Sequence, residues 1–198
     1  MPRGASQGER SMAKTEPASA RVLPDPSRDH CWGPPTAKYT LVEYGDYECA
    51  DSRDAHWAVK ELVPELEAEF CLAFRNLPLT QIHPHAQAAA EAAEAADAQG
   101  KFWLMHDRLF EHQDRLEREH LEAYAREISL DMTTFDRDIR SGEPARRVAA
   151  DVATARHLRV RETPTFFVNG SRYTGPTEFL PLLRALKGAD AGHDRFDK

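Results

Sequence analysis

The sequence predicts an α/β fold with an inserted helical subdomain, and three observations support this fold class. The first is a run rich in β-branched and aromatic residues over 38–45, followed by a helical pattern over 50–69. The second is an alanine-rich helical pattern from about 84 to 158, with no strand signal inside it. The third is a pair of short strand runs after residue 164. Helices between two strand-containing halves indicate an insertion into one mixed domain.

Length and charge limit the classes of function. A chain of 198 residues is long enough for one domain with an insert and a substantial core. The net charge is −7 and the basic residues are interleaved with acidic ones, which argues against a nucleic-acid partner. No apolar run approaches the length needed to cross a bilayer, so we expect no membrane partner. Protein or small-molecule thiols and disulfides fit this composition better.

The cysteines and the chain ends suggest a compartment and domain limits. Cysteines at 31, 49 and 71 form an odd and sparse set that does not resemble a disulfide scaffold. Residues 1–29 lack the apolar core of a secretory signal and are predicted to be a disordered tail. The domain should span 30–188, with its helical insert at about 84–158, and residues 189–198 should fray. We expect a reducing, cytoplasmic setting.

Two strands and one helix are predicted in the first half of the domain. Trp32 stands beside turn residues and should pack against the domain edge before the first strand. The helix that follows contains Pro64, which should kink or break it. A second, largely buried strand over 70–78 ends at a proline, and Cys71 lies in its apolar run. We therefore expect Cys71 to be a core thiol.

The predicted insert consists of helices separated by glycine and serine breaks. The expected helices cover 84–98, 101–113, 118–128, 132–140 and 144–158. Large apolar residues recur at helical spacing in the second of them and should pack in the core: Phe102, Trp103, Met105, Leu109 and Phe110. Histidines at 83, 85, 106 and 112 lack the spacing of a zinc ligand set, so we expect no metal site.

The last part of the chain is predicted to form a hairpin and a helix. Asn169-Gly170 is a strong hairpin turn signal between strand runs over 166–168 and 172–174. Pro164 precedes the first of these runs and must therefore lie at a strand end or a sheet edge. An amphipathic helix over 176–187 should close the domain.

Cys49 is the candidate nucleophile. It stands at the start of the first helical pattern, where free backbone N–H groups and the helix dipole favour a thiolate. The thiolate is the form of cysteine that attacks other sulfur atoms. Acids at 46, 48, 51 and 54 surround this position, and like charge disfavours the thiolate. We therefore expect a thiol less acidic than one in a motif with basic residues.

Several separated motifs resemble the DsbA-like branch of the thioredoxin superfamily, and they cover about residues 30–188. They are Leu41-Val42-Glu43-Tyr44-Gly45-Asp46-Tyr47-Glu48-Cys49, His83-Pro84-His85-Ala86, Gln99-Gly100-Lys101-Phe102-Trp103 and Thr163-Pro164-Thr165-Phe166-Phe167-Val168-Asn169-Gly170. The resemblance implies a thioredoxin fold with an inserted helical subdomain and thiol-disulfide chemistry at Cys49.

The resemblance also implies roles for individual residues. Pro164 should follow a cis peptide bond beside Cys49, and Thr163 should bind the extended chain of a substrate through its backbone. Tyr47 is expected to contribute to the same substrate site. Glu43 matches a buried acid that assists proton transfer, although a simple strand-face residue is the alternative.

One departure from the family pattern changes the expected mechanism. The motif here is Cys49-Ala50-Asp51-Ser52, without a second cysteine, and a dithiol cycle through it is therefore excluded. We expect monothiol chemistry, in which an external thiol such as glutathione resolves the adduct and no other cofactor is needed. Ser52 lies one helical turn from Cys49 and could donate a hydrogen bond to the thiolate.

Three alternatives remain open from the sequence. The protein could be a glutathione transferase that uses Ser52 to activate the glutathione thiol. It could be a redox-inactive peptide-binding module that retains the groove beside Pro164. Cys31 could form a disulfide with Cys49, although a plain, half-exposed thiol is the simpler interpretation because disulfides require close and oriented Cβ atoms.

Overall fold

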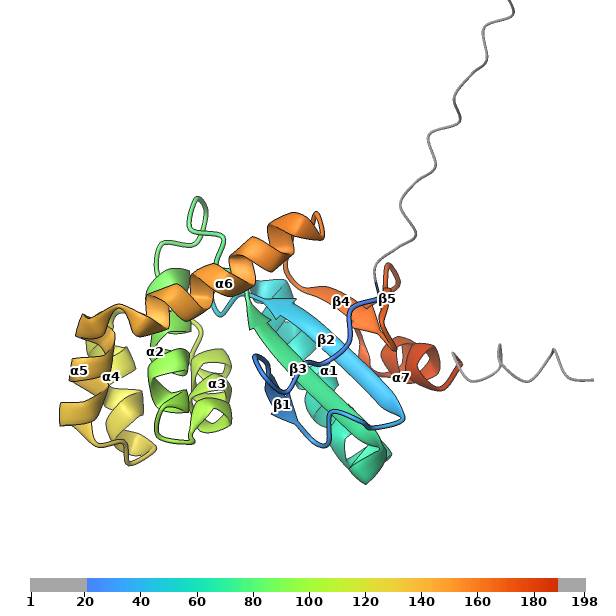
Figure 1. The fold of residues 1–198 in the computed structure, drawn as a ribbon, viewed down its shortest axis with the longest axis horizontal. Coiled ribbons are helices and arrows are strands. Elements are labelled where there is room, and N and C mark those ends of the chain that lie inside the picture. Colours follow the sequence, from blue (N-terminus) through green and yellow to red (C-terminus); the bar gives the residue numbers. More distant parts are fainter. Residues whose placement is uncertain (1–20, 189–198) are drawn as a thin grey trace, which may run out of the picture.

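The computed structural model describes residues 21–188, which form a five-stranded sheet with helices on both faces and a helical subdomain at one side (Figure 1). The strand order is β1-β3-β2-β4-β5. The strands are β1 (His30–Trp32), β2 (Tyr39–Gly45), β3 (Phe70–Asn76), β4 (Thr165–Val168) and β5 (Ser171–Arg172). β2 and β3 run parallel and the other pairs are antiparallel. The central strands β2 and β3 are buried along their whole length because helices cover both faces.

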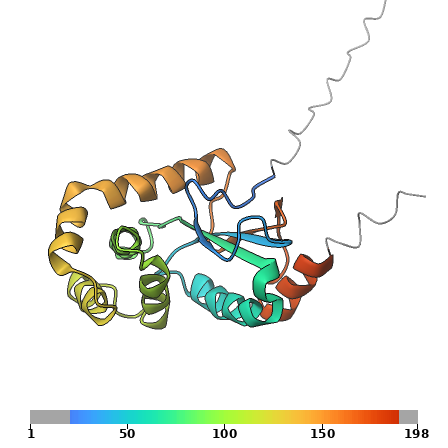
Figure 2. The same ribbon diagram turned by 60° about the horizontal axis from the view of Figure 1, so that its bottom comes forward.

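The two faces of the sheet are covered by different helices, as Figure 2 shows. α1 (Ala50–Leu66) and α7 (Phe179–Gly188) pack on one face and share a core with Leu41 and Phe166. α6 (Glu143–His157) lies on the other face, where its Ala155 meets Val42 and Ala73. The alternating side chains of β2 therefore supply both cores.

The helical subdomain consists of α2 (Ala86–Asp97), α3 (Phe102–Glu111), α4 (Arg118–Glu127), α5 (Met132–Ser141) and the first part of α6. Its core is built around the alanines of α2, whose small side chains let the neighbouring helices approach closely. The aromatic residues Phe102 and Phe110 of α3 fill the space beside them. The predicted α/β fold with a helical insert between its two halves is confirmed.

The N-terminal segment differs from the prediction. Residues 21–29 are not a separate tail, because the Val22 N–H donates to Gly170 O at 2.9 Å and Asp29 is buried against Arg75. The Arg75 guanidinium donates to both Asp29 carboxylate oxygens, at 2.9 and 2.7 Å. A buried guanidinium requires a carboxylate partner, and this segment supplies it. The expected tails over 1–20 and 189–198 lie outside the described residues.

Smaller differences concern element limits. β1 is an edge strand that the sequence did not reveal, since three residues followed by Gly33-Pro34 carry little strand signal. α1 continues past Pro64 to Leu66 and is not broken there. None of the helices in residues 21–188 is both long and apolar enough to cross a bilayer.

Candidate active site

Cys49 lies where β2 leads into α1. It is the N-cap residue of α1, with φ −81° and ψ 121°, and it is largely buried. Its carbonyl accepts the first helical hydrogen bond, from the Arg53 N–H at 3.1 Å. The sulfur is therefore held at the N-terminal end of a 17-residue helix, the end that favours an anion.

The partner of the Cys49 sulfur is the segment that precedes β4. The Thr163-Pro164 peptide bond is cis, as the family resemblance implies. The Cys49 thiol donates to the Thr163 carbonyl at 3.2 Å, although 114 positions separate the two residues. Cys49, Thr163 and Pro164 thus form one site, and only the pairing of β2 with β4 brings them together.

A residue of the insert holds the loop that carries Cys49. The Gln113 side-chain amide donates to Tyr47 O at 2.9 Å and to Cys49 O at 2.8 Å. Gln113 follows α3, so the helical subdomain fixes the backbone of the candidate nucleophile Cys49. No sequence motif distinguishes this glutamine from a surface residue, and sequence reasoning therefore missed it.

Two of the acids beside Cys49 point toward the start of the insert. The buried Asp46 carboxylate accepts from the Leu79 N–H and contacts His83 Nδ1, both at 2.8 Å. Glu48 accepts from the His85 N–H at 2.6 Å. These acids organise the loop through hydrogen bonds, whereas Asp51 and Asp54 remain exposed on the first turns of α1.

Ser52 does not make the expected hydrogen bond to Cys49. It is fully buried, and its hydroxyl accepts from the Asp46 N–H at 3.3 Å. Within residues 21–188 no hydrogen bond joins Ser52 to Cys49. The backbone that turns from β2 into α1 brings the Asp46 N–H to this hydroxyl, so Ser52 serves to close that turn.

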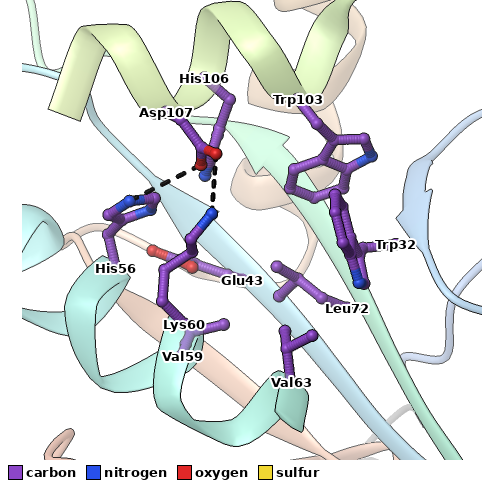
Figure 3. A pocket seen from close by; sticks show the side chains of 10 residues that line it. All are labelled: Trp32, Glu43, His56, Val59, Lys60, Val63, Leu72, Trp103, His106 and Asp107. Atoms are coloured by element: carbon purple, nitrogen blue, oxygen red, sulfur yellow. Dashed lines mark hydrogen bonds and ion pairs between the residues drawn. The ribbon is translucent and has the colours of Figure 1, made fainter. Parts of the chain in front are cut away.

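Glu43 is buried on β2 and faces a cavity of about 80 Å³ between the sheet, α1 and α3 (Figure 3). Its Oε1 has no hydrogen-bond partner in the described part of the chain. Burial raises the pKa of this carboxyl to about 8, so it retains its proton near neutral pH. This position agrees with the interpretation of Glu43 as a buried acid and not with that of a simple strand-face residue.

Four other titratable side chains meet in the same cavity: His56, Lys60, His106 and Asp107. Asp107 lies 3.8 Å from His56 Nε2 and 2.7 Å from Lys60 Nζ (Figure 3). Ligand atoms of His56, His106 and Asp107 all lie within 4.8 Å of one another, so their chemistry would suit a divalent cation. The Lys60 ammonium already serves as the cation beside Asp107. Burial lowers the pKa of His56 to about 4, which keeps that imidazole neutral.

Tyr47 does not lie in the substrate site. Its ring is almost completely buried in the core of the insert, against Phe74 and Phe110. Its hydroxyl is hydrogen-bonded to His106 Nδ1 at 3.0 Å. The expected contact with substrate therefore does not fit the structure, because the hydrophobic core of the insert takes up the aromatic ring.

The remaining cysteines lie away from Cys49. Cys31 is half-buried on β1, opposite Ala73 of β3, which in turn pairs with Val42 of β2. A hydrogen bond from the Cys71 thiol lowers the pKa of Cys31. Cys71 is buried, as predicted. Cys31 is thus two strands across the sheet from β2, which does not favour a disulfide with Cys49.

Comparison with known proteins identifies relatives of this chain. A family model described as thioredoxin matches residues 26–188. A curated relative from Salinispora tropica, named Na(+)/H(+) antiporter NhaA 3, is 46% identical over 167 residues, which are 84% of this chain and 26% of that protein. The chain therefore spans about a quarter of the curated relatives' length, and their name describes much larger proteins.

Solved structures match nearly the whole described domain. A thioredoxin-like oxidoreductase from Silicibacter pomeroyi DSS-3 has a TM-score of 0.74 and 30% identity, covering 85% of this chain and 95% of that chain. The thiol-disulfide exchange protein alpha-DsbA2 from Wolbachia pipientis has a TM-score of 0.71 and 19% identity, covering 80% and 86%. The second match concerns the fold alone. The predicted thioredoxin fold with a helical insert is confirmed.

Proposed function

Because the chain belongs to the thioredoxin family and its motifs resemble the DsbA-like branch of that superfamily, we propose that it is a monothiol thiol-disulfide oxidoreductase acting through Cys49. The observation that carries the proposal is the Cys49 thiol at the start of α1, 3.2 Å from the Thr163 carbonyl beside a cis proline. This position presents a sulfur next to backbone groups that an extended peptide can use.

The proposed reaction has two exchange steps. The Cys49 thiolate attacks one sulfur of a partner disulfide, forms a mixed disulfide, and releases the other sulfur as a thiolate that takes up a proton. A thiolate from an external thiol, such as glutathione, then attacks the partner-derived sulfur of the mixed disulfide. Cys49 leaves as the thiolate, and the partner-derived sulfur ends in a disulfide with the external thiol. One sulfur of the partner disulfide is thereby reduced to a thiol while the external thiol is oxidised.

Glu43 is the proposed proton carrier for these steps. Its carboxyl is buried on β2, six positions before Cys49, and its raised pKa of about 8 provides a proton near neutral pH. A group whose pKa lies near the working pH can both give and accept a proton efficiently. No metal or other cofactor enters this scheme. A reducing, cytoplasmic setting belongs to the proposal because Cys31, Cys49 and Cys71 are all free thiols.

Intact mass after incubation with oxidised glutathione or cystamine tests the proposal. We expect one adduct per chain, complete loss of it in Cys49→Ser, and its retention in the matched control Cys31→Ser. Adduct formation that persists in Cys49→Ser, or that disappears in Cys31→Ser, would contradict the proposal. Turnover is tested by measuring the rate at which an external thiol reduces a mixed disulfide with and without the protein. We expect the rate to be higher with the protein.

A redox-inactive peptide-binding module is the second candidate. The observation that favours it is Ser52 in place of a second cysteine, since Ser52 cannot release a bound partner by exchange. Such a module should bind extended peptides and form no adduct at Cys49. The transferase alternative requires a serine hydroxyl that can reach glutathione, and the complete burial of Ser52 argues against it.

A further inference from the structure

A groove with a volume of about 480 Å³ opens beside Pro164. Four carboxylates line it together with Thr163, Pro164 and Thr177; they belong to Asp51, Asp54, Glu162 and Glu178. Two of the acids come from the first turns of α1, one precedes the cis peptide bond, and one precedes α7. Carboxylates therefore border the groove from three separate segments of the chain.

Little positive charge compensates these acids. The Asp54 carboxylate lies 3.5 Å from the Arg53 guanidinium, and both side chains are well exposed, so the pair contributes weakly. Over residues 21–188 no ion pair joins any of the other three acids to a basic side chain. The groove thus gathers four carboxylates, and Arg53 is the basic residue that an ion pair joins to one of them in the described part of the chain.

A second observation indicates that the groove takes a ligand. Thr163 is only 8% exposed, and its hydroxyl oxygen Oγ1 has no hydrogen-bond partner within the described chain. A buried hydroxyl without a partner is costly, and Thr163 lines the groove, so rotation of its side chain toward a bound donor such as an ammonium or a backbone N–H would satisfy the hydroxyl.

We propose that this groove selects cationic thiols and disulfides, whose ammonium or guanidinium groups lie close to the reacting sulfur. The inference rests on the proposed function, because it names the partner class of the same sulfur. In the first step the Cys49 thiolate bonds to one sulfur of the disulfide and releases the other as a thiolate that still bears its ammonium or guanidinium group. The four carboxylates attract these cationic groups before and during the exchange. Glutathione carries two carboxylates and one ammonium group, so its net negative charge makes it react more slowly at this site than a cationic thiol or disulfide of equal intrinsic reactivity.

Three small disulfides of different charge test the selection. They are the dication cystamine, the neutral 2-hydroxyethyl disulfide and the anion oxidised glutathione. The rate of adduct formation at Cys49 is measured with each of them at low salt. Each rate is divided by the rate at which free 2-mercaptoethanol reacts with the same disulfide. This normalised rate no longer depends on the intrinsic reactivity of the disulfide. We expect cystamine to exceed oxidised glutathione by about tenfold or more, and the ratio to approach one at high salt because salt screens exposed charges.

Charge-removing variants separate the groove from the overall charge of the protein. In Glu162→Gln/Glu178→Gln the ratio of cationic to anionic rates should fall severalfold. The matched control Glu69→Gln/Glu119→Gln removes the same charge at exposed positions outside the groove and should leave the ratio unchanged. Equal normalised rates, or equal effects of the two double variants, would overturn the inference while the proposed function stands. Adduct formation with none of the three disulfides would instead refute the proposed function.

Discussion

In the proposed mechanism, residue 52 decides which sulfur chemistry the site could perform. A serine stands one helical turn after the nucleophile, and its fully buried hydroxyl accepts the Asp46 N–H instead of contacting Cys49. With serine at position 52, release of a mixed disulfide at Cys49 needs an external thiol. With cysteine there, the second thiol of the motif could release it.

Ser52→Cys should therefore create a dithiol motif and give the protein insulin-reductase activity. The new thiol would lie one turn from Cys49 on the same helix, where the two can form a disulfide during each cycle. Turbidity of reduced insulin in the presence of dithiothreitol measures the gain, with Ser52→Ala as the control that should show none. A folded Ser52→Cys protein whose new thiol forms no disulfide with Cys49 would show that this site cannot support the dithiol cycle.

Glu43 gives a second prediction at this scale, on the pH dependence of stability. The folded protein holds a proton on Glu43 up to about pH 8, whereas the unfolded chain loses it near 4.5. The proton on Glu43 thus makes its full contribution to the free energy of unfolding below pH 4.5. As the pH rises from 4.5 to 8 this contribution is lost, at up to about 1.4 kcal/mol per pH unit.

Glu43→Gln removes this loss, since the amide stays neutral at every pH. Its free energy of unfolding, measured by urea titration at pH 5 and 8.5, should fall less than that of the wild type between the two values. The exposed control Glu69→Gln should follow the wild type. Parallel curves for Glu43→Gln and the wild type would contradict a buried, protonated carboxyl.

At the scale of elements, the helical insert positions the active-site loop. Gln113, just after α3, donates two hydrogen bonds to the backbone at Tyr47 and Cys49, and the Tyr47 ring packs against Phe110 of α3. The insert is therefore part of the active-site support and not only an addition to the domain.

Gln113→Ala should slow adduct formation at Cys49 because the loop loses both hydrogen bonds. We expect a rate lower by about tenfold, consistent with one to two hydrogen bonds of about 1 kcal/mol each. Gln99→Ala is the matched control, because Gln99 also makes two side-chain bonds to backbone, with Asp131, but inside the insert. Equal loss of rate in the two variants would mean that general stability, and not loop position, sets the rate.

At the scale of the whole molecule, a buried polar network joins the N-terminal segment, the sheet and α6. The fully buried Asp151 of α6 accepts from Arg28 at 2.8 Å, from Arg147 at 2.7 Å and from the Asn76 N–H at 3.0 Å. Asn76 ends β3 and also donates to Glu94 of α2 at 2.6 Å. These contacts hold the insert to the sheet.

Asp151→Ala should destabilise the fold by about 3 kcal/mol, because it removes the nearest carboxylate from two partly buried guanidinium groups and leaves the buried Asn76 N–H without its acceptor. Chemical denaturation measures the change. Asp136→Ala removes a partly exposed carboxylate that lies 3.5 Å from the exposed Arg140 guanidinium, and should cost less than about 1 kcal/mol. Similar losses in both variants would show that the network adds no stability beyond a surface ion pair.

The sequence alone determined the fold class, the five helices between the two halves, the buried strands and the candidate nucleophile. Hydrophobic periodicity, glycine and proline breaks, and a cysteine at a helix start are local signals, and each records a preference of neighbouring residues. Cys71 in the core and Pro164 beside Cys49 were also predicted, the second from the family resemblance.

Only the tertiary structure decided which side chains meet. Tyr47 lies in the core of the insert, although the sequence suggested a contact with substrate. Ser52 accepts a backbone N–H where a donor to the thiolate was expected, and Asp29 of the predicted tail binds the buried Arg75 guanidinium. The groove acids come from three distant segments, and Gln113 reaches the nucleophile from the insert. Such contacts depend on packing between elements far apart in the chain, and no local pattern in the sequence records them.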